Sequence, residues 1–319
     1  MQHEFVREPE EGFVKRLLDH LKSRVSKDIS FEYTQVLKTN DVKFPALIIH
    51  GENPQVGKTV YLDELLKRFS QGVSMEEIAN QIVCLCNRKE PLEDMDGSEL
   101  IEQMKDWQYL MDGHINFKLI NREKSQKYLE GKTYLPFLDL AIVFCMSVSG
   151  IRNGIATVAI PAEVSKCWGI GLEEAFKQAL EVVQKRFPLK RRTMKDMMFE
   201  LVRKSQGPEA AQEIFRLLRL MDTDIQVQTN SDCINGAITM LYNNSLSELC
   251  TELKTKSLYL IPSSLHEVLI LKKSDIDGWA LKGMVSEINA TQVAAEEVLS
   301  SNIYVYNDDT KEITVWEED

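Results

Sequence analysis

Side-chain types that could carry out acid–base or nucleophilic chemistry gather in residues 257–271, a run that is otherwise apolar. Its polar members are Ser263, Ser264, His266 and Glu267. A histidine that a carboxylate orients can act as a general base and can activate a serine hydroxyl as a nucleophile. Asp139, which lies in the other long apolar run, is the carboxylate that would orient His266. These residues suggest the hypothesis that the protein is a hydrolase-like enzyme.

The same stretch also has a structural interpretation. His266 and Glu267 are adjacent, so on a strand their side chains point to opposite faces. Pro262 cannot donate a hydrogen bond within a central strand, so we expect the strand to break there, with Ser263 and Ser264 satisfying backbone groups at a turn. No glycine-flanked serine elbow accompanies them. We therefore favour a structural corner with a hydrogen-bonded, partly buried histidine. Since burying an unpaired carboxylate is costly, a polar partner is expected for Asp139.

A glycine–lysine–threonine sequence, Gly57, Lys58 and Thr59, follows one predicted strand and precedes a helical pattern. That is the context of a phosphate-binding loop, which requires four residues between its two glycines so that successive N–H groups converge on the phosphates. Here five residues separate Gly51 from Gly57, and Pro54 removes one donor. We interpret the match as false, predict a strand over residues 56–62 and expect no cofactor.

Six cysteines are scattered along the chain without a C-x-x-C pair. They are Cys84, Cys86, Cys145, Cys167, Cys233 and Cys250. Free cysteines commonly behave as small buried hydrophobic residues, and scattered cysteines are typical of a reducing compartment. A zinc site requires grouped ligands, so no metal site is expected.

The chain of 319 residues is acidic, with 49 Asp and Glu against 38 Lys and Arg and a formal charge of −11. Nonspecific binding to nucleic acid requires a basic surface, so this charge argues against that function. The one dense basic run, residues 185–192, is interpreted as a solvated connector between helices, because like charges repel and stay in water.

No signal-peptide pattern opens the chain, and the longest apolar run, residues 138–148, is too short to span a bilayer. We therefore expect a cytoplasmic protein without membrane association. A protein partner is compatible with the sequence, and the oligomeric state does not follow from it.

The length favours two domains. We place the boundary near residue 95, within an acidic segment, so that residues 1–95 form the first region and residues 96–319 the second. The predicted elements of the first region are a helix over 9–26, an antiparallel hairpin of strands 29–37 and 44–49, the strand 56–62 and a helix over 74–88.

The second region contains a weak internal duplication of the order strand, Asn-Gly turn, strand and helix. The first copy comprises 137–148, 153–154, 155–160 and 161–168, and the second comprises 225–229, 235–236, 237–242 and 245–253. Between them, a methionine stripe is interpreted as core packing rather than as an adaptable binding surface. Its members are Met194, Met197 and Met198. A hairpin of strands 303–306 and 313–316 ends the chain. The fold class is α+β, with mixed, mainly antiparallel sheets and packed helices.

Several sequence blocks occur in a fixed order. They are residues 137–143, 166–169, 228–230, 235–237, 260–268, 289–291 and 298–300. In these blocks the chain resembles an uncharacterised domain-of-unknown-function family of anaerobic Gram-positive, Clostridia-type gut bacteria. The resemblance covers most of the chain, and Pro-Ser-Ser-Leu-His-Glu-Val at 262–268 is its most specific part. The family has no assigned activity, so the resemblance implies no catalytic residues.

Two functional hypotheses follow. The first, which we favour because no connected catalytic motif or metal-ligand spacing is present, is a noncatalytic binding or regulatory protein. The second is the hydrolase-like enzyme that uses His266 with Asp139. The distance from the His266 imidazole to carboxylates and serine hydroxyls discriminates between them, because general-base contacts require about 3 Å or one bridging water.

Overall fold

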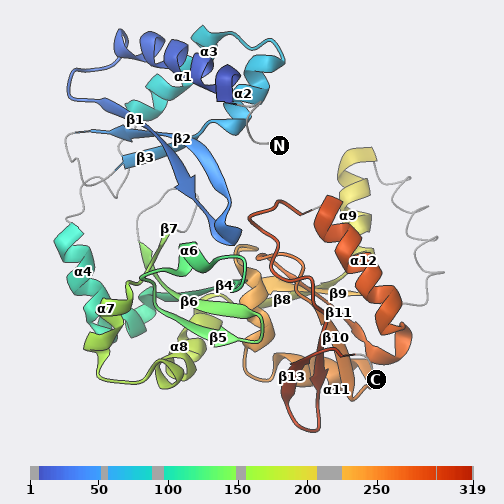
Figure 1. The fold of residues 1–319 in the computed structure, drawn as a ribbon. Coiled ribbons are helices and arrows are strands. Elements are labelled where there is room, and N and C mark those ends of the chain that lie inside the picture. Colours follow the sequence, from blue (N-terminus) through green and yellow to red (C-terminus); the bar gives the residue numbers. More distant parts are fainter. Residues whose placement is uncertain are drawn as a thin grey trace. The chain divides into compact units, whose positions relative to one another are not determined.

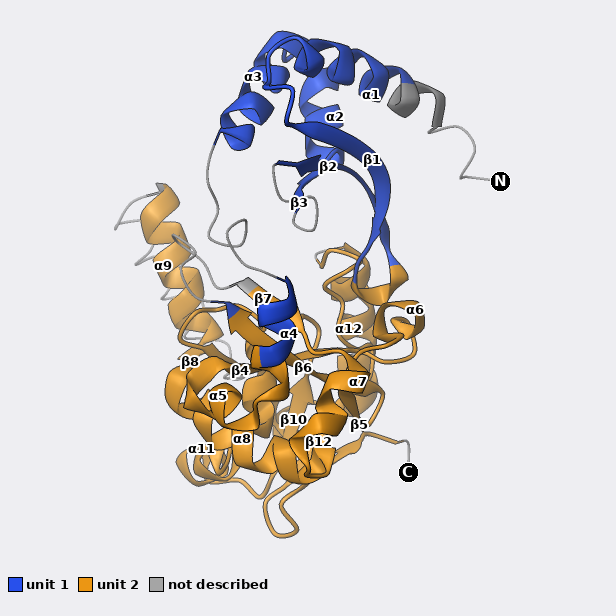
Figure 2. Ribbon diagram, turned by 90° about the vertical axis from the view of Figure 1, so that its left-hand side faces the viewer, with its two compact units in different colours: residues 1–38, 42–102, 148–156 blue, residues 39–41, 103–147, 157–319 orange. Residues whose placement is uncertain are grey.

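A computed structural model of the chain describes residues 7–51, 57–87, 97–148, 156–206, 225–291 and 293–317. Its strands form three antiparallel sheets with helices packed against them (Figure 1), which confirms the α+β class. The chain divides into two compact units (Figure 2). Unit 1 comprises residues 1–38, 42–102 and 148–156, and unit 2 comprises 39–41, 103–147 and 157–319. The boundary predicted at residue 95 lies outside the described residues.

Among its described residues, unit 1 contains a three-stranded sheet of order β1-β2-β3, three complete helices and the start of α4 (Gly97–Lys105). Its elements are α1 (Arg7–Lys22), β1 (Ser30–Leu37), β2 (Lys43–His50), β3 (Gly57–Tyr61), α2 (Asp63–Ser70) and α3 (Met75–Cys86). The predicted hairpin and third strand are both found. Apolar residues of α1 at helical spacing, Phe13, Leu17 and Leu21, form a buried cluster with Leu47 of β2 and neighbours on α3. Hydrophobic periodicity therefore accounts for this small core.

Unit 2 begins with helical segments and contains a sheet of order β4-β6-β5, with β7 also pairing β6. These elements are α4 (Gly97–Lys105, starting in unit 1), α5 (Trp107–Tyr109), η3 (Leu110–His114), β4 (Ile115–Asn121), α6 (Gln126–Leu129), β5 (Tyr134–Phe137), β6 (Leu140–Val148) and β7 (Ala156–Ala159). Every residue of β6 is buried, which explains its continuous apolar sequence. The single strand predicted over 137–148 is two strands, because the backbone turns at Leu138, whose φ is 53°.

The second sheet of unit 2 has six strands in the order β13-β12-β10-β11-β9-β8. The strands are β8 (Leu189–Thr193), β9 (Gln226–Asn230), β10 (Ser257–Ile261), β11 (Val268–Lys272), β12 (Tyr304–Asn307) and β13 (Glu312–Val315). The terminal hairpin is confirmed as β12 and β13. The basic run 185–192, predicted as a connector, instead ends α8 and forms edge strand β8, because it pairs with β9.

The remaining helices of unit 2 are α7 (Ala162–Ser165), η4 (Lys166–Trp168) and α8 (Leu172–Arg186), of which η4 and α8 contact the β4-β6-β5 sheet, and α9 (Met194–Gln206), η5 (Gly236–Leu241), α11 (Ser245–Leu253), η6 (Lys273–Asp275) and α12 (Gly278–Thr291). The short helix η1 (Thr39–Asp41) also belongs to unit 2. Leu281 and Val285 of α12 pack on Tyr259, Ile261 and Leu271, and so cover one face of β10 and β11. No helix in the described part of the chain combines the length and apolar character that crossing a bilayer requires.

The second copy of the predicted duplication is wrong in one element. Residues 237–242, predicted as a strand, lie mostly in the 3₁₀ helix η5. Asn235 has φ 51° and so begins a turn as predicted, but Gly236 packs so closely on the Thr229 side chain and the His266 carbonyl that any larger side chain would collide with them. Residues 236–241 therefore pack against β9 as a short helix, with Gln228 of β9 donating to the Thr239 carbonyl, and form no hairpin strand. The helix predicted at 245–253 is confirmed as α11, and residues 153–154 lie outside the described ranges.

Candidate functional site

A pocket of about 480 Å³ lies between α9 and the β8–β9 end of the six-stranded sheet. Helix α9 contributes Met194, Met197, Met198, Glu200, Leu201 and Lys204. The strands and the loops beside them contribute Lys190, Arg192, Val227, Thr229, Cys233, His266 and Glu267. The pocket therefore brings together the methionine stripe and two residues of the stretch 257–271. Roughly 70 positions in the sequence separate the stripe from these two residues.

Strand alternation decides which side chains of β8 reach the pocket. Arg192 pairs with Val227 and Lys190 with Thr229, so these side chains share one face of the sheet. Val227 in turn pairs with Leu269, which packs against the cluster beneath α12. The pocket thus opens on the face of the sheet that α12 covers elsewhere.

The other face of β8 and β9 carries a buried polar network. Arg191 donates to the side-chain oxygen of Gln228 at 2.9 and 3.1 Å and to the carbonyl of Ser245 at 2.8 Å. Gln228, which is fully buried, donates to the carbonyl of Thr239 at 3.0 Å. Burial lowers the pKa of Arg191, and nearby Glu252 opposes that shift. The network fixes the edge strand to η5 and α11, and so fixes the floor of the pocket.

Helix α9 begins directly after β8 because Thr193 caps it. The Thr193 hydroxyl accepts from the backbone N–H of Asp196 at 3.0 Å and donates to the Asp196 carboxylate at 2.7 Å. One turn further on, Glu200 pairs with Arg192 at 2.8 Å. These two contacts hold the first turns of α9 against the strand, so the methionine side of the helix faces the pocket.

His266 uses both ring nitrogens in hydrogen bonds. Nδ1 lies 3.2 Å from the backbone nitrogen of Asn235, and Nε2 lies 3.3 Å from Glu297 Oε1. A backbone N–H only donates, so Nδ1 accepts and the proton of the neutral ring is on Nε2, from which it is donated to Glu297. No ring nitrogen is left to take a proton from a substrate in this arrangement.

Asp139 has partners other than His266. Its two carboxylate oxygens accept from the hydroxyls of Tyr304 at 2.6 Å and Ser300 at 2.7 Å. Burial, followed by the hydrogen bond to Asp139, raises the pKa of Tyr304 above its usual range. The expected polar partner of Asp139 is therefore found, but the structure gives the histidine and the aspartate separate hydrogen-bond networks.

The stretch 257–271 forms strands β10 and β11 joined by a corner at residues 262–267. Ser264 Oγ accepts from the backbone N–H of His266 at 3.2 Å, as the structural interpretation predicts. Ser263 is buried, and its carbonyl accepts from the N–H of Leu299 at 3.1 Å. Glu267 lines the pocket, and burial raises the pKa of its carboxyl while His266 lowers it.

Gly57, Lys58 and Thr59 lie on strand β3, where Lys58 pairs with Ile49 and its Nζ donates to the carbonyl of Leu85 at 2.9 Å. Successive N–H groups of a strand point in opposite directions, so these residues do not converge on one phosphate. Across the described ranges, no group of three His, Cys, Asp or Glu side chains is placed to hold a metal ion.

The six cysteines are free, and they divide by burial. Cys145 and Cys250 are buried, and burial raises the pKa of Cys145 to about 12. Cys84, Cys167 and Cys233 are exposed. Among them Cys233 lines the pocket, with its sulfur 3.6 Å from the ammonium of Lys190.

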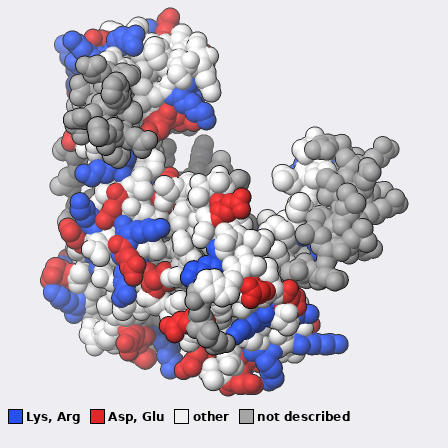
Figure 3. All heavy atoms as spheres, turned by 45° about the vertical axis from the view of Figure 1, so that its right-hand side comes forward, with Lys and Arg blue, Asp and Glu red and all other residues white. Residues whose placement is uncertain are grey.

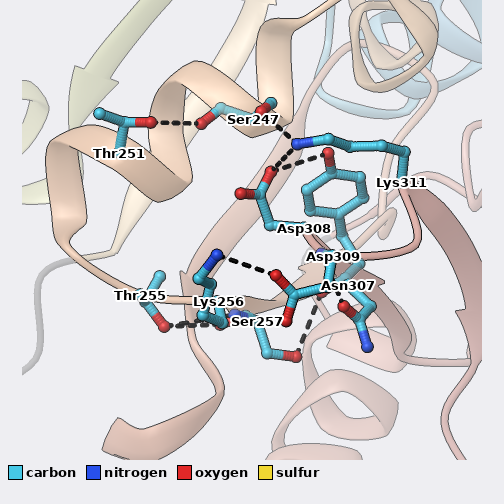
Figure 4. Close-up of polar contacts among 10 residues, drawn as sticks. Ser247, Thr251, Thr255, Lys256, Ser257, Asn307, Asp308, Asp309 and Lys311 are labelled. Carbon is cyan, nitrogen blue, oxygen red and sulfur yellow. Dashed lines mark hydrogen bonds and ion pairs between the residues drawn. The ribbon is translucent and has the colours of Figure 1, made fainter.

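A second polar cluster lies at the β12–β13 turn and on α11 (Figure 4). Lys311 Nζ contacts Asp308 at 2.7 Å and the Ser247 hydroxyl at 2.8 Å, and Lys256 pairs with Asp309 at 2.8 Å. The hydrogen bond from Lys311 lowers the pKa of Asp308. These side chains satisfy one another, so the cluster stabilises the turn rather than forming a site. Elsewhere, on the face drawn in Figure 3, basic and acidic side chains of described residues are interspersed.

Sequence reasoning missed the pocket itself. The methionine stripe was expected to pack in the core, but Met198 is 39% exposed and Leu201 is 68% exposed. Met194 and Met197 are only partly buried. The available signal was the adjacency of this stripe to a strand whose alternate residues, Lys190 and Arg192, are basic.

The sequence matches the model of DUF5688, a family of unknown function, over residues 10–308. No curated protein and no solved structure matches the chain. The resemblance to a domain-of-unknown-function family is thus confirmed at the level of the family. Because the match covers nearly the whole chain, the protein belongs to the DUF5688 family of unknown function.

Proposed function

We propose that this protein is a noncatalytic binding protein that holds a small apolar molecule in the pocket between α9 and strands β8 and β9. The observation that carries this proposal is the pocket's volume, about 480 Å³, combined with its methionine-lined helix. Small-molecule sites commonly measure about 300–1,000 Å³ and are mostly apolar. Methionine side chains are flexible and polarisable, so they adapt to ligands of irregular shape.

The histidine beside the pocket supports binding rather than catalysis. A general base needs a nitrogen free to accept a proton, and both nitrogens of His266 are hydrogen-bonded to Asn235 and Glu297. Ser264, the serine nearest to it in sequence, accepts from the backbone. The corner therefore supports the wall of the pocket and supplies no connected set of nucleophile and base.

Titration with a neutral environment-sensitive dye, N-phenyl-1-naphthylamine, tests the proposal. We expect saturable fluorescence enhancement with one dye per chain. Met197→Asp should weaken dye binding about tenfold or more, because an apolar contact is replaced by a charge. Met284→Asp is the matched control, since Met284 is 49% exposed on α12 and does not line the pocket. Equal effects of the two variants, or no saturable binding, would reject the proposal.

Cysteine alkylation gives a second readout that needs no variant. Bound dye should slow the reaction of iodoacetamide with Cys233, which lines the pocket. Cys84 and Cys167 are also exposed but lie elsewhere, so they serve as internal controls in the same sample. Uniform protection of all three thiols, or of none, would argue against dye binding at this pocket.

A further inference from the structure

Five charged side chains line the pocket, and they are not balanced. The cations are Lys190, Arg192 and Lys204, and the carboxylates are Glu200 and Glu267. Arg192 and Glu200 neutralise each other in an ion pair at 2.8 Å. Within the described ranges, Lys190 and Lys204 form no ion pair; the polar contact of Lys190 is with Cys233 at 3.6 Å. The remaining carboxylate, Glu267, is half-buried, so one carboxylate stands against the two lysines.

The local excess of positive charge contrasts with the whole chain, whose formal charge is −11. Two lysines that pair with no carboxylate of the described residues, beside apolar side chains, are complementary to a molecule with an acidic group and an apolar body. Lysine side chains also suit such a position because their methylene stems pack on apolar surface while the ammonium stays at the edge.

The geometry of α9 defines the size of that molecule. Met194, Met197, Leu201 and Lys204 are spaced three, four and three residues apart, which places them along one side of the helix. From Met194 to Lys204 the helix rises about 15 Å, which is the length scale of a medium-chain alkyl group. The apolar side of α9 formed by Met194, Met197 and Leu201 therefore ends at the ammonium group of Lys204.

We infer that the ligand is a medium-chain amphipathic anion, with its apolar chain along the methionine side of α9 and its acidic head group at Lys190 and Lys204. This inference rests on the proposed function and specifies the class of ligand. Recognition combines apolar burial, which is not directional, with two charges that select the acidic end.

Competition between two ligands of equal chain length tests the inference. Decane-1-sulfonate, a permanent anion, and decan-1-ol, its neutral counterpart, are each used to displace bound N-phenyl-1-naphthylamine below their aggregation concentrations. We expect the sulfonate to bind about tenfold more tightly than the alcohol. Lys190→Met and Lys204→Met should each weaken the sulfonate roughly fivefold and leave the alcohol unchanged. Lys177→Met, at an exposed position of α8 outside the pocket, is the matched control.

The outcomes separate this inference from the proposed function. If the dye binds but sulfonate and alcohol compete equally, or the lysine variants change neither, the anionic ligand class is wrong and the apolar pocket stands. If the dye itself does not bind, the proposed function fails first. Decanoate and decyl phosphate, added as further arms, distinguish carboxylate from phosphate head groups. A preference for the sulfonate that falls to about twofold in Lys190→Met and in Lys204→Met supports the inference.

Discussion

The hydroxyl of Tyr304 lies inside unit 2, where the side chain is fully buried and donates to Asp139 at 2.6 Å. Tyr304→Phe removes this hydroxyl and keeps the ring, so little packing is lost. Hydrogen bonds to charged groups contribute about 1.5–3 kcal/mol. Asp139 keeps its second donor, Ser300, so we expect a loss of about 2 kcal/mol rather than the full cost of an unpaired carboxylate. For a unit of this size that corresponds to a decrease in Tm of about 4–8 °C.

Thermal unfolding followed by circular dichroism measures the change in Tm, and urea unfolding measures the free energy. Tyr306→Phe is the matched control on the same strand, because Asp308 would lose a 3.2 Å contact but keep Lys311 at 2.7 Å. We expect the control to cost less than about 1 kcal/mol. In a double-mutant cycle, Tyr304→Phe and Asp139→Asn should couple by about 1 kcal/mol or more. Additive effects, or equal losses in the two tyrosine variants, would refute the reasoning.

Three further substitutions test the region around the pocket. Glu267→Gln should raise Tm at pH 7. Burial raises the folded-state pKa of the Glu267 carboxyl, so the wild type loses stability as pH rises through that pKa. In a pH series of melting curves, the difference in Tm between variant and wild type should vanish below the ordinary pKa of 4.5. Gln228→Leu should cost about 2–4 kcal/mol in urea unfolding, because Arg191 loses the acceptor of two hydrogen bonds. Gly236→Ala should lower Tm by several degrees, since the added methyl group collides with Thr229; an unchanged Tm would contradict the close approach.

Local sequence rules predicted much of the fold. Proline at 262 and the serines after it indicated the corner between β10 and β11, and alternation indicated β1 and the terminal hairpin. Local rules failed at residues 237–242, where a short apolar run fits a strand and a short helix equally well. Contact of Gly236 with Thr229 and His266 decides between them, and no pattern within the run reports that contact.

The pocket was harder to predict than the fold, for a related reason. Strand β8, with the sequence Leu-Lys-Arg-Arg-Thr, has the composition of a solvated connector, and only its pairing with β9, more than 30 positions later, makes it a strand. The methionine stripe was visible, but its burial depends on what lies opposite. A strand with Lys190 and Arg192 on the facing side leaves a space beside the helix rather than a filled core.

Two residues of the block at 262–268, His266 and Glu267, line the pocket. His266 links three segments, because its backbone N–H bonds Ser264, its Nδ1 bonds the N–H of Asn235 and its Nε2 bonds Glu297. Asn235 ends the loop that carries Cys233, so the imidazole holds one wall of the pocket in place. Loss of binding on removal of His266 would therefore reflect a displaced wall. Asparagine at this position keeps an acceptor for the Asn235 N–H but cannot act as a base. Dye binding that is retained in His266→Asn would therefore show that His266 positions the wall of the pocket.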